Sequence, residues 1–120
     1  MATSVLIVDD NPDITTLLKM RMEKKGFTAE TVYSGEAAMI AAQKNPFDLV
    51  LLDIMLPRVD GFEVCRRLKA GNSKIKVIAM TALDIPGIGD KCFEAGADAV
   101  MLKPFDMDDL EAHLNKMGLF

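Results

Sequence analysis

The sequence is poor in cysteine, has no long apolar run and has no surplus of basic residues. Its two cysteines, Cys65 and Cys92, lie within helical patterns and lack the spacing of metal ligands, which indicates reduced packing thiols. No apolar stretch approaches the ~18 residues that span a bilayer. The first residues also lack the charged and apolar segments of a secretory signal. The sequence therefore predicts a cytoplasmic protein without membrane contact.

Acidic residues outnumber basic ones in this chain. There are 18 Asp and Glu against 14 Lys and Arg, which gives a formal net charge of −4. Binding to nucleic acid requires a basic face for the phosphates, so we expect none by this chain itself. The 120 residues have the length of one domain, 1–120, which can bury about two-thirds of its unfolded surface. The chain stops shortly after its last expected helix, so a further domain could follow Phe120 in the natural protein.

Four runs of mainly apolar residues each end in polar or charged side chains. Continuous apolar runs of this length are typical of strands that are buried on both faces of a parallel sheet. The runs and the residues that follow them are 5–8 with Asp9 and Asp10, 49–52 with Asp53, 75–80 with Thr81, and 99–102 with Lys103. A further, half-polar strand is expected at 27–33, where its composition suits an edge of the sheet.

Helical patterns separate these strands. The expected helix boundaries are Asn11-Pro12-Asp13 as the first helix start, Gly26 as a stop, Ser34 as a cap and Asp106 at the start of the last helix. The fourth helix has the weakest signal, because Pro86, Gly87 and Gly89 disfavour a helix start. We therefore expect it only from about 90 to 95.

A strand followed by a helix, repeated five times, predicts an α/β fold with parallel strands and right-handed crossovers. The expected architecture is doubly wound, with strand order 2-1-3-4-5. This order places the first strand beside the third. Asp9 and Asp10 would then meet Asp53 at the edge where such sheets bind their ligands.

Three carboxylates in one pocket repel each other unless a cation or protons relieve them. Oxygen ligands suit a hard divalent ion such as Mg²⁺, which binds one or two carboxylates and phosphate oxygens. Lys103 would add an ammonium group and Thr81 a hydroxyl donor. A metal, an ammonium and a hydroxyl around one carboxylate describe phosphoryl transfer to that carboxylate.

Four motifs resemble the signature of bacterial two-component response-regulator receiver domains, including those of chemotaxis regulators. In chain order they are Val8-Asp9-Asp10-Asn11, Leu52-Asp53-Ile54-Met55-Leu56-Pro57 with Asp60-Gly61, Met80-Thr81-Ala82, and Leu102-Lys103-Pro104-Phe105. The resemblance covers the whole chain at family-like spacing. It implies a flavodoxin-like (βα)5 fold and a signalling switch that phosphorylation activates.

The resemblance also implies a Mg²⁺ site. Asp10, Asp53 and the backbone carbonyl of Met55 would be direct ligands, and Asp9 would act mostly through metal-bound water. Asp60 is instead interpreted as a turn former.

Asp53 is implied to be the phosphoacceptor, with Thr81 hydrogen-bonded to the phosphoryl group and Lys103 paired with it. The implied donor is a phosphohistidine of a sensor histidine kinase or of a phosphotransfer protein. The chain would then assist its own phosphorylation and dephosphorylation rather than act as an enzyme on other substrates. The fourth helix, fifth strand and last helix would present the changed surface to a downstream target or effector domain.

Two further expectations come from the resemblance. The Lys103–Pro104 peptide bond should be cis. The family usually has an aromatic residue three positions before the lysine, and here that residue is Val100. Valine has a stiff χ1 and little volume, so the usual aromatic relay is in doubt while the site chemistry is unaffected.

Three alternatives belong to other classes of protein. A flavodoxin-like electron carrier would need an uncharged phosphate loop after the first strand, where Asp9 and Asp10 stand. A phosphatase with an aspartyl nucleophile would need a second acid at position 55, which is Met. The runner-up is a degenerate receiver that acts as an interaction module independent of phosphorylation; the complete set of acids, Thr81 and Lys103 argues against it.

Overall fold

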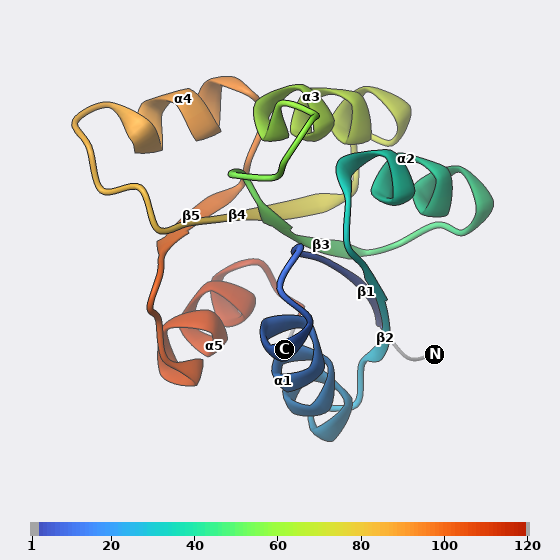
Figure 1. Cartoon of the computed structure of the whole chain (residues 1–120). Coiled ribbons are helices and arrows are strands. Elements are labelled where there is room, and N and C mark those ends of the chain that lie inside the picture. Colours follow the sequence, from blue (N-terminus) through green and yellow to red (C-terminus); the bar gives the residue numbers. More distant parts are fainter. Residues whose placement is uncertain (1–2, 120) are drawn as a thin grey trace.

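A computed structural model describes residues 3–119 and contains five strands that alternate with five helices (Figure 1). In chain order the elements are β1 (Ser4–Val8), α1 (Pro12–Lys24), β2 (Thr28–Val32), α2 (Gly35–Lys44), β3 (Leu49–Asp53), α3 (Gly61–Gly71), β4 (Lys76–Thr81), α4 (Ile88–Glu94), β5 (Ala99–Leu102) and α5 (Met107–Lys116). None of these helices is long and apolar enough to cross a membrane.

The strands form one parallel sheet in the order β2-β1-β3-β4-β5, as predicted. β2 lies at one edge of the sheet, as its half-polar sequence indicated. The central strand β3 is buried at every position. Val8 of β1 pairs with Leu52 of β3, so the two strands end side by side. This register brings the residues that follow β1 next to the last residue of β3.

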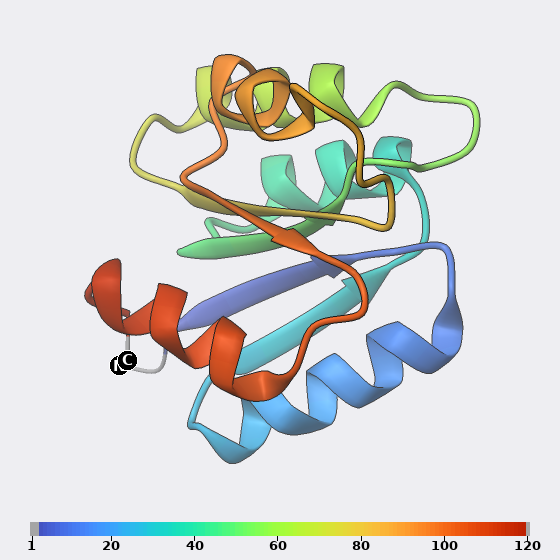
Figure 2. The same cartoon turned by 90° about the vertical axis from the view of Figure 1, so that its left-hand side faces the viewer.

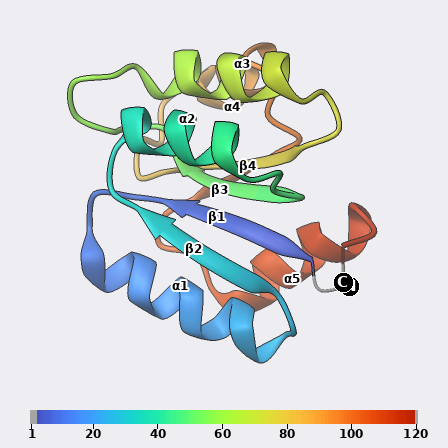
Figure 3. The same ribbon diagram turned by 90° about the vertical axis from the view of Figure 1, so that its right-hand side faces the viewer.

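Helices cover both faces of the sheet. α1 and α5 lie on one face, and α2, α3 and α4 lie on the other (Figures 1, 2 and 3). Alternate strand residues enter the two cores: Ile7 and Leu51 pack with residues of α1 and α5, whereas Leu6 and Leu52 pack with residues of α2, α3 and α4. The strand runs are apolar throughout because each of their two faces meets helices.

Short polar residues begin α1, α2 and α5 where the sequence predicted them. Asn11 accepts a hydrogen bond from Asp13 N at the start of α1, and Ser34 accepts one from Ala37 N at the start of α2. Asp106 and Asp109 form a capping box at the start of α5. Each of these side chains occupies one of the backbone N–H groups that a helix start leaves without an intrahelical partner.

The predicted start of the fourth helix was wrong. α4 begins at Ile88 rather than near residue 90. Gly87 takes φ 83°, a left-handed conformation that glycine adopts without strain, and this lets the chain turn directly into the helix. Ile88 is buried, so its packing supports a first turn that helix propensity alone disfavours.

Both cysteines are free and buried, as their positions in helical patterns indicated. Cys65 on α3 and Cys92 on α4 belong to the same core. Burial raises the pKa of the Cys65 thiol to about 11 and also raises that of Cys92. The two thiols are therefore uncharged packing groups at neutral pH.

Candidate functional site

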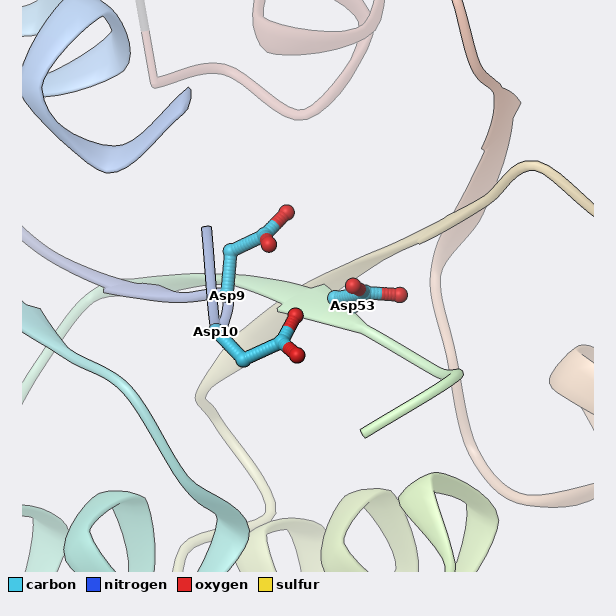
Figure 4. Close-up of side chains that lie close together, drawn as sticks. All are labelled: Asp9, Asp10 and Asp53. Carbon is cyan, nitrogen blue, oxygen red and sulfur yellow. The ribbon is translucent and has the colours of Figure 1, made fainter. Parts of the chain in front are cut away.

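Three carboxylates meet where β1 and β3 end. Asp9 and Asp10 follow β1 directly, and Asp53 is the last residue of β3. One carboxylate oxygen from each of the three residues lies within 4.8 Å of the others. Figure 4 shows the three side chains side by side at this edge of the sheet. The predicted acidic cluster is therefore present, and the strand order creates it.

Burial distinguishes the three acids. Asp9 and Asp53 are 1% and 5% exposed, while Asp10 is exposed. Loss of water around Asp53 raises its pKa above the usual value of 3.8. The hydrogen bond from Met55 and the charge of Lys103 act in the opposite direction without cancelling this effect, and the charge of Asp9 adds to it. The buried carboxylate thus gains from any added positive charge.

Lys103 supplies a positive charge inside this cluster. Its Nζ lies 2.5 Å from Asp9 Oδ2 and 3.3 Å from Asp53 Oδ2. Burial alone would lower the pKa of this ammonium group, but the hydrogen bond to Asp9 and the charges of Asp53 and Asp9 outweigh burial and raise it. The Lys103–Pro104 peptide bond that leads away from the lysine is cis, as the resemblance implied.

Backbone amides orient both buried carboxylates. Asn11 N donates to Asp9 Oδ1 at 3.0 Å, and Met55 N donates to Asp53 Oδ1 at 2.9 Å. In each pair an aspartate accepts from the amide two residues later, which is the geometry of an Asx turn. The sequence patterns did not predict these two amides as parts of the site. They could have done so, because each aspartate stands where a strand turns into a loop, which is a typical place for an Asx turn.

Thr81 ends β4 and is fully buried. Its Oγ1 accepts a hydrogen bond from Leu83 N at 3.0 Å, again from the amide two residues later. A hydroxyl that accepts a bond in this way still has its own hydrogen to donate. Thr81 thus lies at the same edge of the sheet as the three acids, and within residues 3–119 no hydrogen bond joins it to them.

The remaining residues that the sequence singled out, Met55 and Asp60, are not members of the acidic cluster. Met55 is 53% exposed, and its backbone contributes to the site through the N–H that donates to Asp53. Asp60 lies outside the acidic cluster and caps α3, where its Oδ1 accepts from Phe62 N at 2.9 Å. The prediction that Asp60 shapes a turn rather than binds metal is consistent with this position.

The donor set fits a hard divalent cation. Three carboxylates with one lysine leave an excess of negative charge, and two of the carboxylates are buried. Oxygen atoms from three side chains within 4.8 Å can share one ion of the Mg²⁺ type, which retains several waters and needs few protein ligands. The arrangement can therefore hold a cation beside the buried carboxylate of Asp53, whose oxygens can act as nucleophiles.

A family model described as "Response regulator receiver domain" matches residues 5–115 of this chain. The match covers all ten helices and strands except the first residue of β1 and the last residue of α5.

Among curated proteins, the chain is similar to transcriptional regulators. It is 37% identical over 114 residues to the transcriptional regulatory protein TcrA of Mycobacterium tuberculosis, covering 95% of this chain and 45% of that protein. It is 36% identical over 114 residues to the alkaline phosphatase synthesis transcriptional regulatory protein PhoP of Bacillus subtilis, covering 95% of this chain and 48% of PhoP. The chain thus spans about half the length of these relatives.

Solved structures of similar chains have the same fold. The BeF3-activated receiver domain of DrrB, a protein of Thermotoga maritima, is 31% identical, with a TM-score of 0.88 over 98% of this chain and 97% of that one. The chemotaxis protein CheY4 of Vibrio cholerae is 25% identical, with a TM-score of 0.90 over 98% of this chain and 99% of that one.

Proposed function

The chain belongs to the response regulator receiver domain family, and from this we propose that it is a phosphorylation-controlled switch of a two-component system in which Asp53 accepts the phosphoryl group. Receiver domains are phosphoacceptors rather than enzymes that turn over other substrates. We propose that residues 1–120 form one such domain and that it assists both its own phosphorylation and the hydrolysis of the product.

The observation that carries this proposal is the surroundings of Asp53. It is a nearly buried carboxylate with its Oδ2 3.3 Å from an ammonium group and two further acids beside it. In the proposed reaction an oxygen of Asp53 attacks phosphorus. The bond from phosphorus to the donor histidine nitrogen breaks, and its electron pair stays on the imidazole.

We assign the chain's own groups as follows. The Met55 amide donates to Oδ1 of Asp53, so that Oδ2 faces the Lys103 ammonium group. Lys103 would transfer its contact from the carboxylates to the incoming phosphoryl oxygens, whose charge it matches. Thr81 would donate its hydroxyl hydrogen to the same group after a movement of the β4 end.

Asp10, Asp53 and the Met55 carbonyl are the proposed direct ligands of Mg²⁺, and Asp9 the proposed partner of its bound water. When bound, this ion neutralises the charge that gathers on the transferred phosphoryl group. The excess of carboxylates over lysine supports this assignment.

The proposed donor is a sensor histidine kinase or a phosphotransfer protein in the cytoplasm. The relatives named above are transcriptional regulators about twice as long as this chain. We therefore propose that the signal passes to an effector domain or target protein through the surface of α4, β5 and α5.

The proposal is tested by intact-mass spectrometry after incubation with acetyl phosphate and Mg²⁺. We expect one added phosphoryl group on the wild type and none on Asp53→Asn. Asp108→Asn, which removes an exposed acid on α5, serves as the matched control and should be phosphorylated like the wild type. Labelling of Asp53→Asn at an unchanged rate would refute the acceptor, and an unlabelled wild type would favour a module that works without phosphorylation.

A further inference from the structure

We propose that Gly61 is a positioning residue for the phosphoacceptor site, because it lets α3 begin against the peptide group that holds Asp53. Gly61 is the first residue of α3 and is buried. The connection from β3 runs out from the edge of the sheet and then returns to α3 (Figure 2). This inference rests on the proposed function of Asp53.

Two backbone segments, at Gly61 and Ile54, approach each other very closely. A Cβ atom built on Gly61 would lie 2.2 Å from the carbonyl oxygen of Ile54, 2.6 Å from its Cα and 2.7 Å from its carbonyl carbon. Side-chain atoms are absent from these three contacts, so rotation of a side chain cannot relieve them. The φ angle of Gly61 is not positive. Glycine is therefore needed here because it lacks a Cβ atom, and not because the backbone is left-handed.

Both the backbone and the side chain of Ile54 are held in place next to α3. Its amide donates to Met80 O at 2.9 Å, which ties it to β4. Ile54 is 3% exposed and lies in the same core cluster as Val64 of α3. A methyl group at position 61 must therefore displace the start of α3 or the backbone of Ile54.

The displaced group is part of the site. The carbonyl of Ile54 and the N–H of Met55 belong to one planar peptide group, so they move together. That N–H donates to Asp53 Oδ1 at 2.9 Å. A tilt of this peptide would lengthen the bond to Asp53, turn its carboxylate and move the Met55 carbonyl, which is the proposed third metal ligand.

Two other glycines provide controls for helix packing. A Cβ on Gly71, the last residue of the same helix, would meet nothing within 4 Å. A Cβ on Gly35 at the start of α2 would meet Val64 Cγ2 of α3 at 2.7 Å and Val59 Cβ at 3.3 Å, both of them side-chain atoms. Val59 lies in the connection that leads from β3 to α3. Gly35→Ala thus crowds α3 and this connection through side chains, and none of the three nearest atoms belongs to Ile54.

The experiment compares Gly61→Ala, Gly35→Ala and Gly71→Ala with the wild type. Mg²⁺ is titrated alone by calorimetry, and the Met55 amide is followed by NMR in metal-free protein. For Gly61→Ala we expect a shifted Met55 resonance and a Mg²⁺ dissociation constant raised roughly tenfold or more, the usual effect of losing a group that orients a ligand. Its labelling by acetyl phosphate at saturating Mg²⁺ should also be slower. The two control variants should match the wild type in these three measurements.

Gly61→Ala with an unshifted Met55 amide and unchanged Mg²⁺ affinity would overturn the inference, and so would equal losses in Gly35→Ala. A wild type that takes up no phosphoryl group would refute the proposed function instead, while the Met55 amide still tests the contact. If Gly61→Ala does not fold, Asp60→Ala loosens the same helix start, and Ser34→Ala removes the equivalent cap from α2. Weaker Mg²⁺ binding in Asp60→Ala alone would support the inference, and equal binding in both variants would overturn it.

Discussion

At the residue scale, Asp53 is a charged group whose surroundings favour its neutral form. It is 5% exposed and lies beside Asp9 and Asp10, and its pKa is raised. A carboxylate with a raised pKa in the folded state holds its proton more tightly there than in the unfolded chain. Its ionisation therefore lowers the free energy of unfolding as the pH rises through the folded pKa.

This sign leads to a prediction for Asp53→Asn, which cannot ionise. Without Mg²⁺ at pH 7, we expect the variant to have a higher free energy of unfolding than the wild type. The difference should shrink as the pH falls from the raised folded pKa toward the usual 3.8. Over this range Asp53 of the wild type becomes protonated, first in the folded and then in the unfolded state, and so resembles the uncharged Asn. Urea unfolding from pH 4 to pH 7.5 measures the difference, with exposed Asp108→Asn as control. A difference that grows on acidification would contradict the assignment.

Lys103 is the internal counter-charge of the same cluster. We expect Lys103→Met to lower the free energy of unfolding of the metal-free protein by about 2–4 kcal/mol at pH 7, since it leaves the buried Asp9 and Asp53 without their ammonium partner. Mg²⁺ should then stabilise the variant more than it stabilises the wild type, because Mg²⁺ and the Lys103 ammonium group relieve the same repulsion between the carboxylates. Urea unfolding with and without Mg²⁺ tests this, and an equal or smaller gain in the variant would show that the two cations act independently.

At the scale of elements, the connection from β4 to α4 leads away from Thr81 and is exposed at every position but Leu83. Ile85 within it is 47% exposed, and Gly87, the N-cap residue of α4, provides no side-chain cap for the helix. Val100 on β5 is half-buried and packs against the core beneath α2, α3 and α4. A movement of Thr81 can therefore reorder the β4–α4 connection, whereas Val100 has little freedom to respond.

We accordingly predict that the switch runs through residues 83–90. NMR spectra with and without beryllofluoride and Mg²⁺ should show the largest amide shifts outside the site in residues 83–92. Val100→Ala should leave these shifts nearly unchanged, and Thr81→Ala should abolish them. If Val100→Ala abolishes them as completely as Thr81→Ala does, the signal passes through β5 instead.

At the scale of the whole molecule, the acidic cluster joins strands that are distant in sequence. β1 and β3 lie next to each other in the sheet, and each contributes to the cluster through its carboxyl end. An ion that binds there links the two strands only in the folded state, since an unfolded chain does not hold Asp53 near Asp9 and Asp10. Ion binding and global stability are therefore coupled.

We expect Mg²⁺ to raise the free energy of unfolding of the wild type. At 100 times its dissociation constant the gain is about 2.7 kcal/mol if only the folded state binds the ion. Asp10→Asn should reduce the gain, because it removes an exposed ligand without disturbing Lys103 and its partners. Thermal unfolding over a range of Mg²⁺ concentrations measures the effect. A wild-type melting temperature that does not respond to millimolar Mg²⁺ would rule out the metal site.

Much of this architecture could be predicted from local patterns alone. The apolar runs identified the four most buried strands, and parallel pairing required their carboxyl ends to share one edge. Asp9, Asp10 and Asp53 could be placed together for that reason, without any knowledge of side-chain positions. The caps at Asn11, Ser34 and Asp106 were also predictable, because a cap depends on the few residues around it.

Other features depended on the tertiary structure. The contact of Lys103 with Asp9 at 2.5 Å, closer than its contact with Asp53, joins residues 94 positions apart and depends on how the strand ends are offset. α4 begins before residue 90 because buried Ile88 outweighs weak local propensity. The approach of Gly61 to Ile54 likewise arises only when α3 packs on the sheet. Sequence patterns determined which groups reach the edge of the sheet, whereas packing between distant segments decided their contacts, because those distances depend on every layer between them.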